Sequence, residues 1–212
     1  DMDFTRPGAV DAPRLLALAR RESATSMFGS PALLRRVLSA TKHKDQRLGT
    51  MRRIVSAGAP VPASTLAGLR DVLGADATVH TPYGATEALP VSSIESREIL
   101  GATEHGTRHG EGVCVGSPCA NVSVRILPID DAPLPPDALT RVCPTGVIGE
   151  ITVSGPAVTA GYFRDPGADE LAKIIETDRS PRRVWHRMGD LGYLDDAGRL
   201  WYAGRKSQRV QD

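Results

Sequence analysis

The sequence predicts an α/β fold that continues into a mainly β part, and three observations carry this prediction. In the first half, short apolar runs alternate with segments whose apolar residues recur every three to four positions. Residues 101–112 then contain four glycines and two histidines with little apolar content. Beyond them, apolar and polar residues alternate, as in half-buried strands. The chain has 212 residues, 41% of them hydrophobic and 24% charged, which is enough for a sizeable core.

The elements of the first half have local signals. Ser30 and Pro31 predict a helix start, because the hydroxyl accepts from a free N–H and a proline at the first helical position loses no hydrogen bond. Gly74 predicts a helix end. Helices are expected at residues 14–21, from residue 31 onward and at 64–73, and strands at 25–28, 51–57 and 77–81. This alternation of strands and helices predicts a parallel sheet.

The second half carries strand and turn signals. Val122, Val124 and Ile126 alternate with polar residues, and residues 151–154 repeat the pattern. The Asp-Asp-Ala-Gly sequence at 195–198 predicts a hairpin turn. Three further predictions are a connecting loop at 130–137, a helix at 168–176 and a long surface loop with a domain boundary at 101–112.

Charge and composition exclude some classes of function. Lys plus Arg (26) nearly balance Asp plus Glu (25), so the basic field that nucleic-acid binding requires is missing. No apolar run approaches the roughly 20 residues of a membrane span, and residues 1–4 are acidic where a signal peptide is basic. The three cysteines form no C-x-x-C pair, which favours reduced thiols. We therefore expect a cytoplasmic protein without nucleic-acid partners.

Residues 83–87, which follow the third expected strand, contain four parts of a nucleotide site. The Tyr83 ring can stack on a base, and Gly84 lets the backbone come close to a ligand. The Thr86 hydroxyl can reach a phosphate oxygen, and the Glu87 carboxylate can hold Mg²⁺. The alternative is an ordinary turn after a strand, with a half-buried tyrosine.

Three further segments lie where a strand is expected to end, which is where α/β proteins bind ligands. Residues 56–60 are small, so a flat ring can lie against them. Asp190, between glycines 189 and 192, can accept from both hydroxyls of a ribose, and Arg205 can bridge ribose and phosphate oxygens. The alternatives are a Gly-Pro loop, a β-turn aspartate and a solvated basic tail.

Together these segments resemble the ordered core motifs of the adenylate-forming enzymes, a superfamily of acyl-CoA synthetases, peptide-synthetase adenylation domains and luciferase. The segments that agree are residues 83–87, 149–156 running into 161–163, 189–192 and 204–205. The resemblance spans about residues 25–208 and implies the C-terminal part of the large domain, a parallel sheet with helices plus a small distorted β-barrel. It implies a partial α/β subdomain with the adenine and magnesium motif at 1–105, a β-barrel-like subdomain at 106–204 and a hinge at 205–212.

The resemblance also implies an ATP-dependent ligase that activates a carboxylic acid as an acyl-adenylate and releases pyrophosphate. Its ligands would be ATP or AMP, Mg²⁺ and the acid. By position, it assigns Tyr83 to adenine, with Gly58, Ala59 and Pro60 in the same pocket. It assigns Gly84 to the nucleotide, Thr86 to phosphate, Glu87 to Mg²⁺, Asp190 to ribose and Arg205 to the nucleotide beside the hinge.

Two parts of the family pattern are missing. The Ser/Thr/Gly-rich loop that ends in lysine and holds the β- and γ-phosphates does not occur between Asp1 and Thr81, and the chain stops at the hinge, before the domain with the catalytic lysine. We therefore expect a fragment of the large domain, without the N- and C-terminal parts of its own chain. Such a fragment is expected not to adenylate by itself.

Residues 83–91 and 112–116 look most like the β-lactone-forming branch of the superfamily, from bacterial long-chain olefin biosynthesis. That branch implies a long-chain β-hydroxy fatty acid as substrate and partner enzymes of the same biosynthesis. Ser207 stands at the hinge position where acyl-CoA synthetases carry Asp or Lys. This suits a second step without coenzyme A, in which the substrate's own β-hydroxyl attacks the adenylate.

Other functions stay open from the sequence. Within the superfamily, the alternatives are a fatty acyl-CoA synthetase and a peptide-synthetase adenylation domain. Outside it, the β half can be a non-catalytic interaction domain. His105 and His109, with Cys114 and Cys119 nearby, can also be interpreted as a zinc site, although their spacing matches no known zinc module.

Overall fold

The computed structural model describes residues 5–41, 48–176 and 182–210. The acidic start at 1–4, on which the signal-peptide argument depends, lies outside these residues. The chain divides into two compact units, one with Asp1–Pro82 and Ile94–Glu104, the other with Tyr83–Ser93 and His105–Asp212. Strands β3 (Thr78–Ala85) and β4 (Ala88–Glu95) contribute residues to both units.

The first unit begins with a parallel sheet, as the sequence predicts. Strands β1, β2 and β3 pair in parallel, with Met27, Ile54 and Val79 in register. The helix starts also follow their local signals, because the Asp11 side chain accepts from the Arg14 N–H at 3.1 Å and Ser30 Oγ accepts from the Leu33 N–H at 3.4 Å. The elements up to β3 are η1 (Pro7–Ala9), α1 (Ala12–Arg21), β1 (Ser26–Phe28), α2 (Pro31–Ala40), β2 (Arg53–Val55) and α3 (Ala63–Val72).

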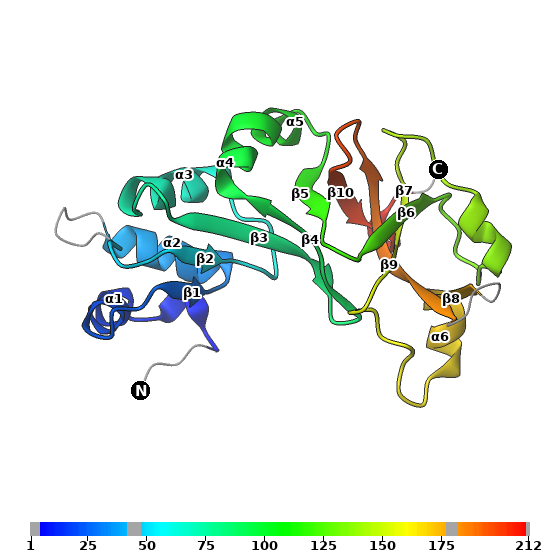
Figure 1. The fold of residues 1–212 in the computed structure, drawn as a ribbon, viewed down its shortest axis with the longest axis horizontal. Helices are drawn as coiled ribbons and strands as arrows, with labels where there is room; N and C mark the ends of the chain where they lie inside the picture. Colours follow the sequence, from blue (N-terminus) through cyan, green and yellow to red (C-terminus); the bar gives the residue numbers. More distant parts are fainter. Residues whose placement is uncertain (1–4, 42–47, 177–181, 211–212) are drawn as a thin grey trace. The chain divides into compact units, whose positions relative to one another are not determined.

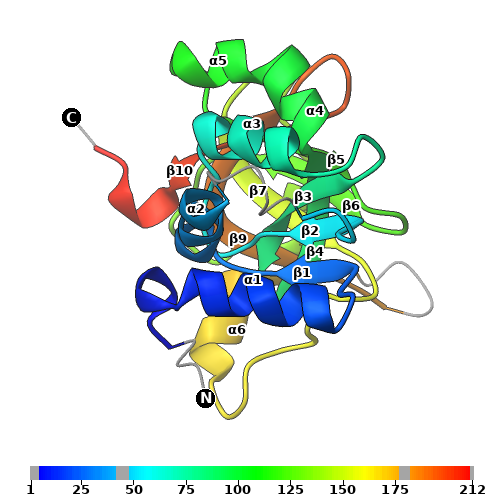
Figure 2. The ribbon, with the colours of Figure 1, turned by 90° about the vertical axis from the view of Figure 1, so that its left-hand side faces the viewer.

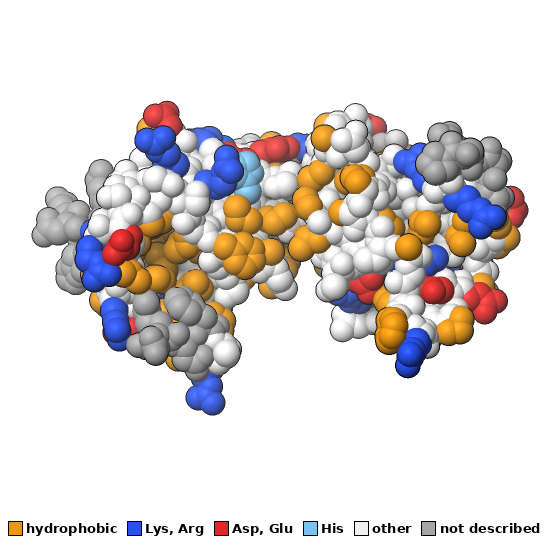
Figure 3. Space-filling view, turned by 60° about the horizontal axis from the view of Figure 1, so that its bottom comes forward, with side chains coloured by type: hydrophobic (Ala, Val, Ile, Leu, Met, Phe, Trp, Pro, Cys, Tyr) orange, Lys and Arg blue, Asp and Glu red, His pale blue; other side chains and the backbone are white. Residues whose placement is uncertain are grey.

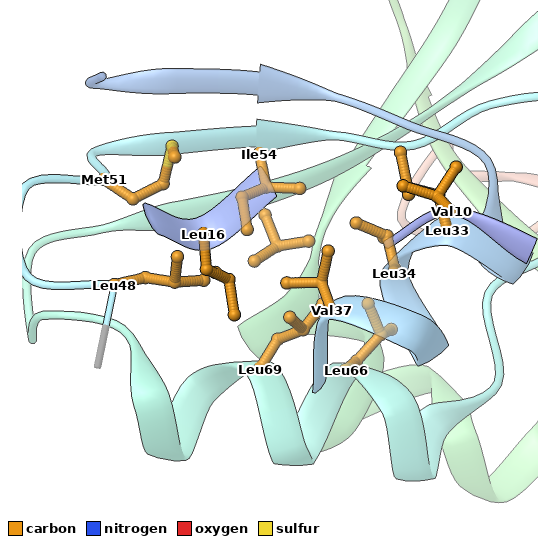
Figure 4. Packing of buried hydrophobic residues seen from close by; sticks show 11 residues of the cluster. Val10, Leu16, Leu33, Leu34, Val37, Leu48, Met51, Ile54, Leu66 and Leu69 are labelled. Atoms are coloured by element: carbon orange, nitrogen blue, oxygen red, sulfur yellow. The ribbon is translucent and has the colours of Figure 1, made fainter. Parts of the chain in front are cut away.

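The core of this unit lies between its helices and its strands. Helices α1, α2 and α3 cluster beside β1 and β2 (Figure 2). Side chains from all three helices point toward Ile54 of β2 (Figure 4), and Leu34, Leu66 and Ile54 are fully buried. The apolar period of the helical sequences therefore marks the buried face of each helix.

The loop expected at residues 101–112 is wrong for its first part, which is helical. Helix α4 (Ser96–Glu98), a π-helical turn η3 (Ile99–Thr103) and α5 (Glu104–Arg108) follow one another. Gly106 serves close packing, since a Cβ there would lie 2.8 Å from the Trp201 ring. Positive φ angles at Gly110 and Gly112 come only after α5 has ended.

The second unit is built from antiparallel strands. They follow the order β4-β5-β10-β9-β7-β6, and β8 pairs with β9 (Figure 1). Beyond α5, the elements are β5 (Val113–Pro118), β6 (Ser123–Leu127), η4 (Pro136–Thr140), β7 (Gly149–Ser154), α6 (Pro166–Ala172), β8 (Lys173–Glu176), β9 (Arg183–Leu194), β10 (Leu200–Arg205) and η5 (Lys206–Gln208). The predicted change from α/β to mainly β is thus confirmed, while the distorted barrel stays a prediction.

Two local predictions in this unit have opposite outcomes. The turn at 195–198 is confirmed as the connection from β9 to β10, where the Gly198 N–H donates to the Asp195 carbonyl at 2.9 Å. The helix expected at 168–176 is wrong in its second half, because α6 ends at Ala172 and β8 follows. Ile174 of β8 pairs with Trp185 and is buried with it, so pairing with β9 decides the conformation here.

The surface of the chain is mixed. Figure 3 shows hydrophobic side chains among charged ones, and Phe28, Leu89 and Phe163 are mostly exposed. The three cysteines are free thiols, as predicted. No helix in the described part of the chain has the length and apolar character needed to cross a membrane.

Candidate active site

The first part of the site is the hairpin formed by the ends of β3 and β4. The sequence predicts a strand end at residue 81, but β3 continues through Ala85, and only Thr86 and Glu87 form the turn. Tyr83 and Ala85 pack against the core of the second unit, which explains the longer strand. A Cβ on Gly84 would lie 2.4 Å from the Ala88 carbonyl oxygen, so the close approach of the two backbones requires glycine.

Three predicted site residues meet in the second unit. The Tyr83 hydroxyl donates to Oδ2 of Asp190 at 2.6 Å. Asp190 and Arg205 are cross-strand partners of β9 and β10, and Nη1 of Arg205 lies 3.0 Å from Oδ1 of Asp190. This ion pair lacks hydrogen-bond geometry. Oδ1 is therefore a buried oxygen that accepts no hydrogen bond from the described residues.

Burial dominates the electrostatics of this group. It raises the pKa of Asp190, although the hydrogen bond from Tyr83 and the charge of Arg205 oppose the shift. It also raises the pKa of the Tyr83 phenol, and the neighbouring Asp190 carboxylate adds to the effect. Tyr83 therefore stays a neutral donor beside the carboxylate at neutral pH.

The second part of the site surrounds Glu87. The Tyr162 hydroxyl donates to Oε1 of Glu87 at 2.9 Å, and the Thr159 N–H donates to the Glu87 carbonyl oxygen at 2.8 Å. The Lys173 ammonium donates to the carbonyl oxygen and to Oγ1 of Thr159, both at 2.9 Å. The His186 ring also lies near Tyr162, with 6.5 Å between the ring centroids. Both the main chain and the side chain of Glu87 are thus held by the loop before α6.

These contacts fix the protonation states at neutral pH. The hydrogen bond from Tyr162 lowers the pKa of Glu87, so this carboxyl is ionised. Burial and the Glu87 charge raise the pKa of Tyr162 to about 12, which keeps the phenol a donor. Burial, assisted by the charge of Lys173, lowers the pKa of His186 to about 4, so its imidazole is neutral.

A buried ion cluster connects strands β7 and β9 with the 3₁₀ turn η5, which follows β10. Nη2 of Arg187 lies 2.7 Å from Oε2 of Glu150, and Nζ of Lys206 lies 3.0 Å from Oε1. The Glu150 and Arg187 side chains are 1% and 2% exposed, so both charges are removed from water. The Arg187 guanidinium also donates to carbonyl oxygens of residues 130, 132 and 171. Every charge in the cluster therefore has a partner, as buried ions require.

The remaining predicted site residues contact neither the group around Asp190 nor the Glu87 carboxylate through any hydrogen bond or ion pair that the structure describes. Thr86 is exposed at the tip of the hairpin. Gly58, Ala59 and Pro60 are exposed after β2 in the first unit, and the φ of +94° at Gly58 favours glycine. Their assignment to adenine stays a prediction. The zinc interpretation gains no support, since no three His, Cys, Asp or Glu side chains gather as ligands anywhere in the described ranges.

Sequence reasoning missed the roles of several residues. Tyr162 and Glu150 lie within motifs that carry the family resemblance, but the motifs alone do not reveal which groups they contact. Lys173, His186 and Arg187 had no signal. Lys173 falls in a segment with a helical pattern and the other two in ordinary strand sequence, and each gains its partners only from the tertiary fold.

Comparison with known proteins identifies the family. A model of the family described as AMP-binding enzyme matches residues 4–163. The chain belongs to this family. It is 53% identical to the olefin beta-lactone synthetase of Stenotrophomonas maltophilia (strain K279a) and 49% identical to that of Xanthomonas campestris pv. campestris, each over 213 aligned residues. The alignments cover all of this chain but only 38% and 37% of those proteins. The resemblance to the adenylate-forming enzymes is thus confirmed.

The fold comparison agrees with the family assignment. The structure of O-succinylbenzoate coenzyme A synthetase from Bacillus subtilis, in complex with ATP and magnesium ion, matches with a TM-score of 0.71 and 24% identity. The match covers 94% of this chain and 35% of that protein. The chain therefore has the fold of one part of an AMP-binding enzyme.

The residues present suit a nucleotide and a magnesium ion. The orphaned Oδ1 of Asp190 needs a hydrogen-bond donor, which a ribose hydroxyl supplies. Glu87 is an ionised, half-buried carboxylate with Oε1 bonded to Tyr162, and its Oε2 accepts from no side chain that the structure describes. Protein sites for Mg²⁺ often supply only one or two carboxylates and leave the other positions to phosphate oxygens and water.

Proposed function

We propose that this chain forms the nucleotide-binding part of an ATP-dependent ligase that activates a carboxylic acid as an acyl-adenylate. The observation that carries the proposal is the arrangement of Tyr83, Asp190 and Arg205. An aromatic ring, a buried carboxylate with an unsatisfied oxygen and a half-exposed guanidinium lie together in one unit. This combination fits a base, a ribose and a phosphate, the three parts of a nucleotide.

Each group has a distinct role in the proposal. Tyr83 stacks on adenine through its ring, while its hydroxyl keeps Asp190 oriented. Asp190 accepts from the ribose hydroxyls. Arg205, whose side chain is 53% exposed, turns from Asp190 to the phosphate when the nucleotide takes its place.

The adenylation step needs neutralisation of negative charge. A carboxylate oxygen of the substrate attacks the α-phosphorus of ATP, and the bond to pyrophosphate breaks. Arg205 donates to the phosphate oxygens, and Thr86, at the tip of the hairpin, supplies a hydroxyl donor. Glu87 would hold Mg²⁺, which supplies the Lewis-acid charge that offsets the phosphates.

The proposed carboxylic acid substrate is a long-chain β-hydroxy fatty acid. The two relatives that share about half of the aligned residues with this chain carry the name olefin beta-lactone synthetase, which favours a long-chain β-hydroxy fatty acid. The β-hydroxyl oxygen would then attack the activated acyl carbon, AMP would leave, and the hydroxyl proton would be released. Because nucleophile and electrophile belong to one molecule, this ring closure has a high effective concentration and needs no coenzyme A.

The chain spans under two fifths of the length of those relatives, so activity is tested on the full-length protein that contains it. The protein is supplied with Mg-ATP and a long-chain β-hydroxy acid, a plain fatty acid or an amino-acid mixture, with and without coenzyme A. Pyrophosphate is measured and products are identified by mass spectrometry. We expect pyrophosphate and a product that has lost one water from the β-hydroxy acid, without coenzyme A.

The other products distinguish the alternatives. A coenzyme A thioester would favour an acyl-CoA synthetase, and an aminoacyl-adenylate would favour a peptide-synthetase adenylation domain. Absence of pyrophosphate with every acid would contradict the ligase proposal and favour a non-catalytic interaction domain.

The ribose assignment is tested with Asp190→Asn in the same protein. The amide removes the charge and one acceptor oxygen, which should lower kcat/KM for ATP about 10- to 100-fold, the effect of about 1.5–3 kcal/mol for a charged hydrogen bond. Asp196→Asn is the matched control, because this aspartate is exposed in the turn between β9 and β10. Equal kcat/KM values in the two variants would contradict the role of Asp190.

A further inference from the structure

The Glu87 carboxylate is placed by a loop that is remote in sequence. Glu87 occupies a two-residue turn between β3 and β4. Its carbonyl oxygen accepts from the Thr159 N–H at 2.8 Å, and its Oε1 accepts from the Tyr162 hydroxyl at 2.9 Å. Main chain and side chain are thus fixed from the same loop between β7 and α6.

The donor in this contact is itself held in place. The Tyr162 N–H donates to Oδ1 of Asp169 at 2.7 Å. A Cβ on Gly161 would lie 2.8 Å from the Asp169 carboxylate, so the preceding glycine permits this approach. Lys173 Nζ lies 5.4 Å from the centroid of the Tyr162 ring, and the His186 ring meets the same ring nearly edge-on. The phenol therefore has few alternative positions.

Thr159, whose N–H donates to the Glu87 carbonyl oxygen, is also held in place. The Lys173 ammonium donates to both oxygens of Thr159, each at 2.9 Å. These two bonds fix the residue whose N–H holds the Glu87 carbonyl. Lys173 is itself buried in β8 and belongs to a paired strand, so the loop is anchored to the sheet.

We propose that Tyr162 is a positioning residue for metal binding: its hydroxyl holds Oε1 of Glu87 so that Oε2 would be available to a divalent cation bound together with the nucleotide. This inference rests on the proposed function. A ligand carboxylate that is hydrogen-bonded through its other oxygen loses less rotamer entropy when the metal binds. Tyr162 does not touch the nucleotide or the metal in this scheme, and it acts only through Glu87.

The test measures binding of Mn²⁺, used as the probe for the divalent cation, to the full-length protein with ATP, from the electron paramagnetic resonance signal of free Mn²⁺. Tyr162→Phe removes only the hydroxyl and leaves the ring contacts in place. We expect the dissociation constant for Mn²⁺ to rise about tenfold, within the 10- to 100-fold range known for partners of metal ligands. The affinity for ATP measured without metal should stay unchanged.

Two variants accompany this measurement. Tyr193→Phe is the matched control, because it removes another phenol hydrogen bond of the second unit, to the Glu111 carbonyl at 3.0 Å, and should bind Mn²⁺ like the unmodified protein. Glu87→Gln removes the ligand charge and should weaken Mn²⁺ binding further than Tyr162→Phe does.

The results for the variants distinguish the role of Tyr162 from the role of Glu87 as a metal ligand. If Glu87→Gln weakens Mn²⁺ binding while Tyr162→Phe binds like the unmodified protein, the role of Tyr162 is overturned and the metal assignment stands. If neither variant changes Mn²⁺ binding, Glu87 is not a metal ligand, and the proposal for Tyr162 is overturned together with that part of the proposed function. An equal loss in Tyr193→Phe and Tyr162→Phe would also overturn it.

Discussion

The buried cluster of Glu150, Arg187 and Lys206 allows the sharpest stability prediction. In Glu150→Gln, the amide has nearly the shape of the carboxylate but no charge, and its NH₂ group faces two cationic donors. At an effective dielectric of about 20, one pair of unit charges 2.7 Å apart contributes about 6 kcal/mol before desolvation is counted. Removing one member of a buried ion pair costs about 3–5 kcal/mol net, and we expect this loss in the free energy of unfolding.

Urea denaturation with tryptophan fluorescence measures this effect. Both tryptophans, Trp185 and Trp201, are buried in the second unit and report its unfolding. With an m-value of about 2 kcal/mol per molar urea, the midpoint should fall by about 1.5–2.5 M.

The control for this experiment is Asp131→Asn. Asp131 forms an ion pair with Arg209, but its side chain is 65% exposed, so its loss should cost less than about 1 kcal/mol. Equal midpoint shifts in Glu150→Gln and Asp131→Asn would refute the reasoning, because burial would then not determine the cost of removing a charge.

Two further predictions concern the same unit. The folded-state pKa of His186 is about 4, below its ordinary value of 6.5, so between these pH values the unfolded chain binds a proton that the folded chain does not. The unfolding free energy should therefore fall by up to about 3 kcal/mol as the pH is lowered from 6.5 to 4. Urea titrations over this pH range measure the fall, which His186→Gln should lack. Parallel pH profiles of the unmodified protein and the variant would argue against a neutral buried imidazole. Gly84→Ala should destabilise the unit by about 1–3 kcal/mol, because the added Cβ would lie 2.4 Å from the Ala88 carbonyl oxygen. The control is Gly167→Ala in α6. Its added Cβ meets no atom closer than 3.7 Å, so this variant should be neutral or stabilising. Thermal unfolding of the two alanine variants compares them directly, and equal melting temperatures would count against the steric argument.

The local elements are largely readable from the sequence. Helix α2 begins where Ser30 and Pro31 predict, and the Asp-Asp-Ala-Gly turn joins β9 to β10. Such signals work because capping and turn geometry depend on residues within a few positions of each other. The proposed nucleotide motifs stand out in the sequence for a similar reason, since each is a short run of residue types suited to one part of a nucleotide.

The prediction failed where packing outweighs local preference. Residues 173–176 continue a helical pattern in the sequence, yet they form β8 because Ile174 gains burial against Trp185 of β9. The glycines at 101 and 106 indicate a loop by composition, yet they lie in helical turns, where Gly106 lets Trp201 approach. In both places the deciding partner lies outside the segment itself: Trp185 is 11 positions from Ile174, and Trp201 is 95 positions from Gly106.

The sequence by itself determined the parallel start of the fold and the change to β structure, and it supplied the residue types on which the proposed nucleotide site rests. Only the tertiary structure decided which of these groups touch: Tyr83 with Asp190, 107 positions apart, and Glu87 with Tyr162, 75 positions apart. The physical reason is that backbone preferences act between neighbours in sequence, whereas hydrogen bonds between side chains depend on strand register and burial. Those are properties of the whole packed unit, and no short motif contains them.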